Sequence, residues 1–218
     1  MVEFALLCPV WVTLLLGTLW YGTAMIRGLQ VTQMARDFAS MYSRSVDFST
    51  AGTVTNPSAQ DNLLPKITRE LGSLTATAGP GVAIFSAITY VGADQCQLAG
   101  GIYWDSGGNV PTANCTNYIT KSFVFTQRYT VGTKGLRSSN FGAPDTNDPD
   151  STKQYRIPIA KYVSNANDVV KGFKLIPSPD VDPGGYKSGQ PIYVVEVYYG
   201  GTSQPGYGAG GAYAYAIF

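Results

Sequence analysis

The chain has 218 residues, of which 13% are charged and 44% hydrophobic, and its formal net charge is +1. This composition argues against nucleic-acid binding and against a polybasic lipid-binding patch, because both need clustered positive charge. The sequence contains no histidine. That absence argues against a Ser-His-Asp hydrolase, against haem held by imidazole and against the commonest zinc and copper sites. We therefore expect neither an enzyme nor a cofactor.

An apolar run near the N-terminus is the most informative segment. Residues 4–26 carry no charged side chain, and Glu3 stands just before them. Roughly 20 apolar residues in a helix are long enough to cross the hydrocarbon core of a bilayer. The run lacks the basic start and the small-residue cleavage site of a secretory signal, and it is longer than the apolar core of one. We expect a retained helix.

The same helix is predicted to continue, in amphipathic form, to about Ser45. Beyond residue 26 the apolar side chains recur at spacings of three and four, which is the helical period. They are Leu29, Val31, Met34, Ala35, Phe38, Met41 and Tyr42. A helix of this length is on the order of 60 Å long. Its length fits a transmembrane anchor with a stalk and a polymerising helix equally well.

Four residues of the helix suggest more than an anchor. Pro9 lacks an N–H and predicts a bend or a local loosening. Gly17 and Gly22, each followed by a threonine, predict a small-residue patch of the kind that packs helices in lipid. A carboxylate such as Glu3 at the edge of an apolar helix is costly unless it is paired. The terminal amine of a neighbouring subunit is the partner that we expect.

Together these residues resemble the N-terminus of TadE-like pseudopilins of the tight-adherence (Tad) pilus machinery, within the type IV pilin-like superfamily. The resemblance covers about 45 residues and is carried by Val2-Glu3-Phe4-Ala5-Leu6-Leu7, Pro9, the glycine-containing apolar run and Gln33-Met34-Ala35-Arg36-Asp37. It implies a precursor with a short basic leader that a prepilin peptidase removes. The mature chain would then wait in the inner membrane until the pilus assembly machinery extracts it into an extracellular filament.

The position of the acid differs from the family pattern. In that family the glutamate is the fifth residue of the mature chain, whereas here it is the third. We expect either that the sequence lacks about two mature residues, with Met1 not the initiator, or that processing differs.

The function that follows is a structural subunit of a pilus-like filament at the cell surface, a helical homo-oligomer. Glu3, Phe4, Pro9, Gly17 and Gly22 are the expected assembly residues, and Glu3 would set the axial register by neutralising a neighbour's amine. Three alternatives remain. They are a minor pseudopilin or tip adhesin, a membrane-anchored domain that binds a surface ligand, and an electron-conducting fibre of stacked aromatic residues.

The predicted fold class is α+β. Residues 1–48 form the helix, and residues 49–218 form a β-rich globular domain with an antiparallel sheet, long loops and a short helix near residues 58–71. Runs rich in Val, Ile, Thr, Tyr and Phe predict strands at residues 82–91, 118–131, 154–159, 192–199 and 212–218. Gly, Pro, Asp, Asn and Ser predict loops at 132–153, 177–190 and 200–211. Loops of this length are functional surfaces or flexible segments, and in a filament neighbouring subunits could order them.

The three cysteines divide by location. Cys8 lies in the apolar helix, where a free thiol behaves as a small hydrophobic group. Cys96 and Cys115 flank a polar loop in the presumed exterior. A disulfide between them would suit an oxidising compartment and, for a loop of about 20 residues, contribute roughly 3 kcal/mol.

Several other motifs carry weaker signals. Closely spaced oxygen ligands make Asp145, Asn147, Asp148 and Asp150 a weak calcium candidate. Pro149 occupies the third ligand position and no bidentate glutamate follows, so a solvated turn is favoured. The protease-like Asp105-Ser106-Gly107-Gly108 has no histidine to activate it, and the G-x-G-x-x-G at residues 206–211 has no helix after it. Asn114-Cys115-Thr116 is a weak glycosylation sequon because of its cysteine.

Glu196 stands out because it interrupts an apolar strand. Strand alternation places it on the same face as Val194 and Tyr198. We expect it either to pair with a Lys or Arg of a neighbouring strand or to face solvent.

Overall fold

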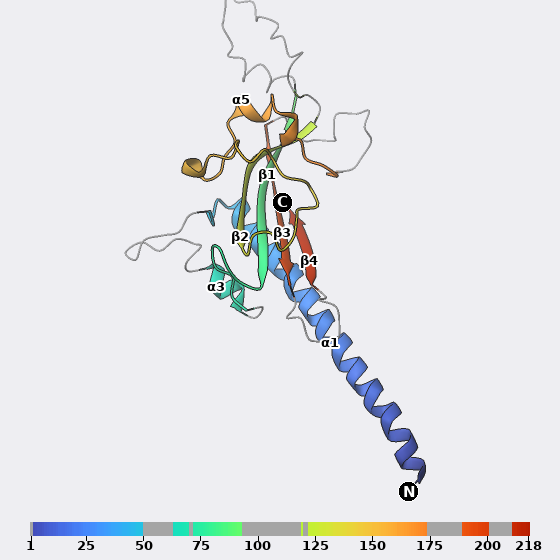
Figure 1. Cartoon of the computed structure of the whole chain (residues 1–218). Helices are drawn as coiled ribbons and strands as arrows, with labels where there is room; N and C mark the ends of the chain where they lie inside the picture. Colours follow the sequence, from blue (N-terminus) through green and yellow to red (C-terminus); the bar gives the residue numbers. More distant parts are fainter. Residues whose placement is uncertain are drawn as a thin grey trace, which may run out of the picture.

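The computed structural model describes residues 2–49, 63–69, 72–92, 119, 122–173, 189–200 and 211–218, with the side chains of the N-terminal helix described from Cys8 onward. In this part of the chain a long helix precedes a globular domain that contains a four-stranded antiparallel sheet (Figure 1). The predicted α+β fold class is confirmed.

Helix α1 spans Val2–Ser43 and is continuous through Pro9. Its N-terminal half projects away from the sheet as an isolated rod, and its C-terminal half lies against the sheet (Figure 1). The helix ends two residues before the predicted position. Ser45 adopts a left-handed conformation with φ of 66°, and its N–H donates to the carbonyl of Tyr42 at 3.0 Å. A left-handed residue terminates an α-helix, and here a serine fills the place that glycine usually takes.

The sheet has the strand order β2-β1-β3-β4, and all its pairings are antiparallel. The strands are β1 Gly81–Val91, β2 Ser122–Gly132, β3 Pro191–Tyr199 and β4 Ala212–Ile217. Four of the five predicted strands are therefore present, with ends that differ by a few residues. A bulge on β2 lies opposite the step from Ala87 to Ile88 of β1.

The fifth predicted strand, at residues 154–159, is wrong. Gln154 and Tyr155 adopt left-handed conformations with φ of 59° and 58°, which no strand tolerates. Arg156 makes only isolated bridges to Gln127 and Asp150. The segment instead leads from the short helix η3, Ser151–Lys153, into α5, Ile159–Tyr162, which is followed by η4, Ala166–Asp168.

The predicted short helix near residues 58–71 appears in the described chain as α3, Leu64–Ile67. Much of the remaining loop sequence lies outside the described residues. This applies to Cys96 and Cys115, to the segments with the protease-like motif and the sequon, and to most of the loops predicted at 177–190 and 200–211.

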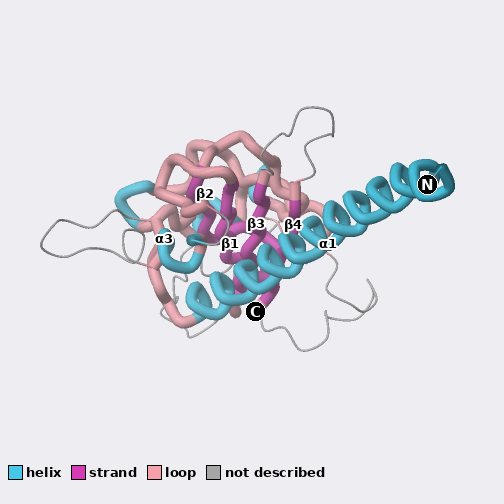
Figure 2. Tube along the Cα trace, turned by 90° about the horizontal axis from the view of Figure 1, so that it is seen from below, coloured by secondary structure: helices cyan, strands magenta, loops and turns pink. Residues whose placement is uncertain are grey.

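Two apolar clusters hold the domain together, one on each face of the sheet. The first cluster joins α1 to the sheet and includes Val31, Phe38, Phe85 and Val195. The second cluster joins the opposite face of the sheet to the segment 141–173, and its members include Ile88, Phe125, Phe141, Val163 and Val170. The sheet is thus the middle layer, with α1 on one side and loops with short helices on the other (Figure 2).

Candidate functional site

The protruding half of α1, residues 8–29, exposes an apolar surface. Twelve of the sixteen exposed large hydrophobic side chains in the described chain lie there, between Val10 and Leu29. Trp11, for example, is 70% exposed. By length and composition, α1 is also the one helix among the described residues that is long and apolar enough to cross a membrane. A surface this apolar requires lipid or a protein partner.

Small residues interrupt this surface. A Cβ added at Gly17 or at Gly22 would meet no atom within 4 Å beyond the adjoining backbone of its own helix, so neither glycine serves packing inside the domain. The hydroxyls of Thr18 and Thr23 donate to the carbonyls of Leu15 and Trp20, each at 2.9 Å. These bonds satisfy the hydroxyls within the helix, which suits an apolar environment. Five residues apart, the two glycines lie about 140° from each other around the helix, so they do not form one patch.

The remaining predicted assembly residues lie at the start of α1. Pro9 does not interrupt the helix, and the hydroxyl of Thr13 donates to the carbonyl of Pro9 at 3.0 Å and to that of Val10 at 2.9 Å. Glu3 and Phe4 fall within the first turns of α1, but their side chains lie outside the described part. Cys8 is a free, exposed thiol on the same helix.

The docked half of α1, residues 31–43, is fixed to the domain by aromatic contacts. The ring of Phe38 meets the rings of Phe48 and Phe85 edge-on, with both centroid distances at 5.5 Å. Tyr42 contacts Tyr193 at 4.9 Å, and its hydroxyl donates to Oε1 of Gln127 at 2.9 Å. These contacts hold the helix against three strands, so the direction of the protruding half is set by the sheet.

On the opposite face of the sheet, Glu196 is buried and accepts three hydrogen bonds. The donors are the Ser139 hydroxyl, the backbone N–H of Asn140 at 2.9 Å and the Tyr213 hydroxyl at 2.6 Å. Strand alternation was predicted correctly, but neither expected partner is found: no ion pair to Glu196 is formed within the described residues, and the side chain does not face solvent. The carboxylate instead ties the loop after β2 to strands β3 and β4.

Two arginines accompany this carboxylate. The guanidinium of Arg137 lies 4.0 Å from the centroid of the Tyr213 ring. Burial lowers the pKa of Arg128 to about 10, and the negative charge of Glu196 opposes that shift. Arg128 also donates to the Ser86 hydroxyl at 3.3 Å. Positive charge near Glu196 offsets part of the cost of burying its carboxylate.

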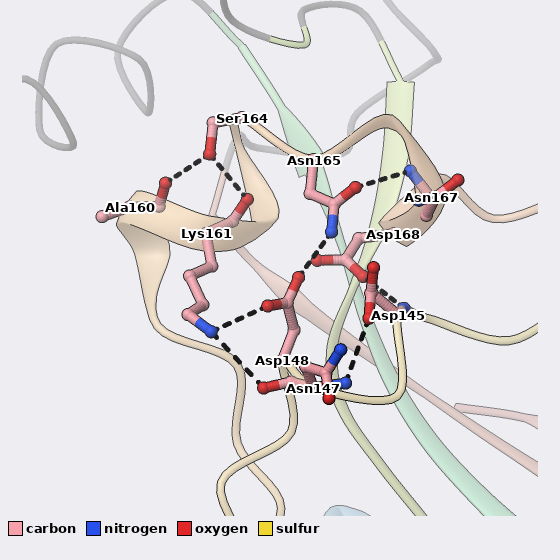
Figure 3. Close-up of polar contacts among 9 residues, drawn as sticks. All are labelled: Asp145, Asn147, Asp148, Ala160, Lys161, Ser164, Asn165, Asn167 and Asp168. Atoms are coloured by element: carbon pink, nitrogen blue, oxygen red, sulfur yellow. Dashed lines mark hydrogen bonds and ion pairs between the residues drawn. The ribbon is translucent and has the colours of Figure 1, made fainter.

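A second polar cluster joins the loop at residues 145–150 to α5 and η4 (Figure 3). The carboxylate of Asp148 accepts from Nζ of Lys161 at 2.8 Å and from Nδ2 of Asn165 at 2.6 Å. Asp168 is fully buried, and its Oδ1 accepts from the backbone N–H of Asp145 at 2.9 Å. No sequence pattern pointed to Lys161, Asn165 or Asp168, which are distant in sequence from the acidic run.

The residues of the calcium candidate have separate protein partners. Oδ1 of Asp145 accepts from the backbone N–H of Asn147 at 3.1 Å, and Asp150 lies 3.9 Å from Lys153. Asp148 is bound by Lys161 and by the Asn165 amide, as described above. Over the described ranges, no three His, Cys, Asp or Glu side chains are grouped so that they could hold a metal ion.

Comparison with known proteins identifies the helical segment. Residues 1–40 match the family model described as TadE-like protein. The comparison with curated proteins and the comparison with solved structures each found no match. The matched region contains the protruding half of α1 and most of its docked half. The resemblance drawn from the first 45 residues is thus confirmed over residues 1–40, and the N-terminal part of this chain is TadE-like.

Proposed function

We propose that this chain is a structural subunit of an extracellular pilus-like filament, in which the α1 helices of many copies form the core and the sheet domains coat the outside. The coarser conclusion, a pilin-like protein associated with the Tad pilus, rests on the TadE-like segment. Before assembly, the protruding half of α1 would hold the chain in the inner membrane. Prepilin peptidase and the assembly machinery are the partners that this route requires.

The observation that carries the proposal is the division of α1 into two halves. The docked half buries Phe38 and Tyr42 in the domain, whereas the protruding half exposes a dozen large apolar side chains. Moving such a helix from lipid into a protein core exchanges one apolar environment for another, so helix packing and polar pairing must favour assembly. The small residues supply the close approach that this packing needs.

The placement of the glycines favours contact with more than one neighbouring helix. Gly17 and Gly22 open two different sides of the same rod, since they lie about 140° apart. A simple anchor in lipid needs no such positions, and a helix dimer needs one. In a core of many parallel helices, neighbouring helices surround each α1, so both glycine positions can contact a neighbour.

Glu3 is the residue proposed to set the register of assembly. A carboxylate next to an apolar run is stabilised when a cation of a neighbouring subunit meets it, and it is costly in any other alignment. The terminal amine of the next copy is the expected cation. An incoming subunit would then be favoured only in one axial position.

The test is to replace Glu3 with Gln in the full chain, in cells that carry the assembly machinery. We expect normal insertion of the chain in the inner membrane and loss, or irregular spacing, of sheared extracellular filaments. Asp37→Asn is the matched control, because it removes an exposed acid from the docked half of the same helix. Filaments of normal yield and symmetry from the Glu3→Gln chain would contradict the role of Glu3.

Two alternatives use the same helix and differ in outcome. A minor pseudopilin or tip adhesin would be present in sheared filaments only in trace amounts relative to the main subunit. A membrane-anchored surface-binding domain would remain a monomer in detergent and would bind a ligand, such as a glycan, without polymerising. Quantifying the chain in purified filaments therefore separates all three.

A further inference from the structure

The cluster around Asp168 contains a buried carboxyl oxygen that has no donor. Asp168 has no exposed surface, and its Oδ1 already accepts the N–H of Asp145. Its Oδ2 is buried without a hydrogen-bond partner. A buried unsatisfied oxygen is costly, and an unsatisfied ionised one is costlier still.

The group that faces this carboxyl is another carboxyl. Figure 3 shows the side chains of Asp168 and Asp148 directed toward each other, and the two lie within hydrogen-bonding reach. Asp148 already accepts from Lys161 and Asn165, so those two donors are engaged with it. Two ionised carboxylates at this distance repel each other, whereas one shared proton converts the contact into a hydrogen bond.

We propose that Asp148 and Asp168 share one proton and that this proton links the loop at residues 145–148 to η4. When the proton is lost, the segment 141–173, which covers the face of the sheet opposite α1 (the outer face), loosens. Asp168 carries the proton and donates it from Oδ2 to Asp148. Asp148 stays ionised, because it has the ammonium group of Lys161 and the amide of Asn165 as further donors.

The surrounding charges agree with this assignment. The charged groups that face Asp168 are Asp145 and Asp148 from the loop and Lys161 from α5. Burial raises the pKa of Asp168 to about 6; the N–H of Asp145 opposes this shift, and the charge of Asp148 reinforces it. Burial also disfavours the charged form of Asp148, but the hydrogen bonds from Lys161 and Asn165 outweigh it and lower that pKa.

The proton matters because of what this layer covers. Tyr162, Val163 and Val170 are neighbours in sequence of Lys161 and Asp168, and they belong to the apolar cluster that includes Phe125 of β2. Val169 of the same segment bridges to Val124 at the edge of β2. Loss of the hydrogen bond between Asp168 and Asp148 exposes these apolar side chains and releases the loop at residues 145–148. The outer surface of the domain is therefore sensitive to pH.

The experiment uses the full chain in detergent micelles and follows two signals against pH. The first is the carboxyl ¹³C shift of Asp168, expected to titrate near pH 6 rather than near 4. The second is hydrogen exchange of the Asp145 amide, with each rate divided by the intrinsic rate at that pH. If the pKa is ordinary in the open loop, the open population should rise about 50-fold between pH 4 and pH 7.5.

Asp168→Asn supplies the decisive variant. Its carboxamide keeps an acceptor for the Asp145 N–H and offers Asp148 a permanent donor, so the normalised exchange should no longer rise between pH 4 and pH 7.5. Asp150→Asn, in the same loop, is the control that should keep the dependence. If Asp168→Asn does not fold, the wild-type carboxyl titration decides alone. An Asp168 carboxyl that titrates near its ordinary value, with or without binding of millimolar Ca²⁺, would overturn the proposal.

Discussion

The two halves of α1 should respond in opposite ways to loss of an aromatic side chain. Phe38→Ala removes a ring that is fully buried and meets Phe48 and Phe85 at 5.5 Å. Truncating a buried Phe costs about 3–5 kcal/mol, a figure that already contains much of the loss of such ring contacts. We therefore expect the free energy of unfolding of the domain to fall by about 4 kcal/mol. Trp11→Ala removes a larger but exposed ring, so the expected change is within about 0.5 kcal/mol.

Hydrogen exchange of the amides of β1 and β3 measures this difference in the detergent-solubilised full chain. Each 1.4 kcal/mol is a factor of ten, so Phe38→Ala should accelerate exchange of the slowest sheet amides about 1,000-fold. Trp11→Ala should leave those amides within about threefold of the wild type. Equal effects of the two substitutions would refute the division of α1 into docked and protruding halves. Slow sheet amides in the Phe38→Ala chain would refute the docking itself.

Two further predictions concern the protruding half and the buried acid. Gly17→Leu should leave the sheet amides as slow as in the wild type, because a Cβ added at Gly17 has no atom of the domain within 4 Å, yet it should abolish filaments in sheared fractions. A Gly17→Leu variant that lost both the slow exchange of the sheet amides and the filaments would point to a folding role for Gly17. Glu196→Ala should cost about 3–5 kcal/mol by urea unfolding, since three donors lose their acceptor and Arg128 loses a counter-charge. Glu196→Gln keeps an acceptor, so its free energy of unfolding should fall by less than that of Glu196→Ala. Equal decreases in the two variants would contradict the role of Glu196 as an acceptor.

The main elements could be predicted from the sequence because their signals are local. Helix α1 follows from an uncharged run joined to apolar residues at helical spacing, and β1 and β3 follow from runs of Val, Ile and Tyr. The error at residues 154–159 has a local cause. Gln154 and Tyr155 have strand-forming neighbours, but their left-handed backbone makes a turn, and Pro158 precedes the helical turn at Ile159.

The polar clusters could not be predicted, because their partners are far apart in sequence. Ser139 meets Glu196 because the loop after β2 folds over the face of the sheet opposite α1, and Tyr213 meets it because β4 pairs with β3. Asp168 meets Asp148 because η4 and α5 fold back on the loop at residues 145–150. Alternation along β3 assigned Glu196 to its face correctly, but the sequence offered no sign that this face would be covered. Burial of that face is a tertiary property.

The acidic pair predicts the shape of the pH–stability curve. Asp168 has a raised pKa in the folded state, so its contribution is full below its ordinary value and is lost as the pH rises through about 6. Asp148 has a lowered pKa, so its contribution is present above its ordinary value and is lost as the pH falls through the lowered one. The two limbs cross on the acidic side of neutrality, and unfolding in urea across pH 3 to 8 should place the greatest stability there in the wild type. In Asp168→Asn the upper limb should disappear and the lower limb should stay.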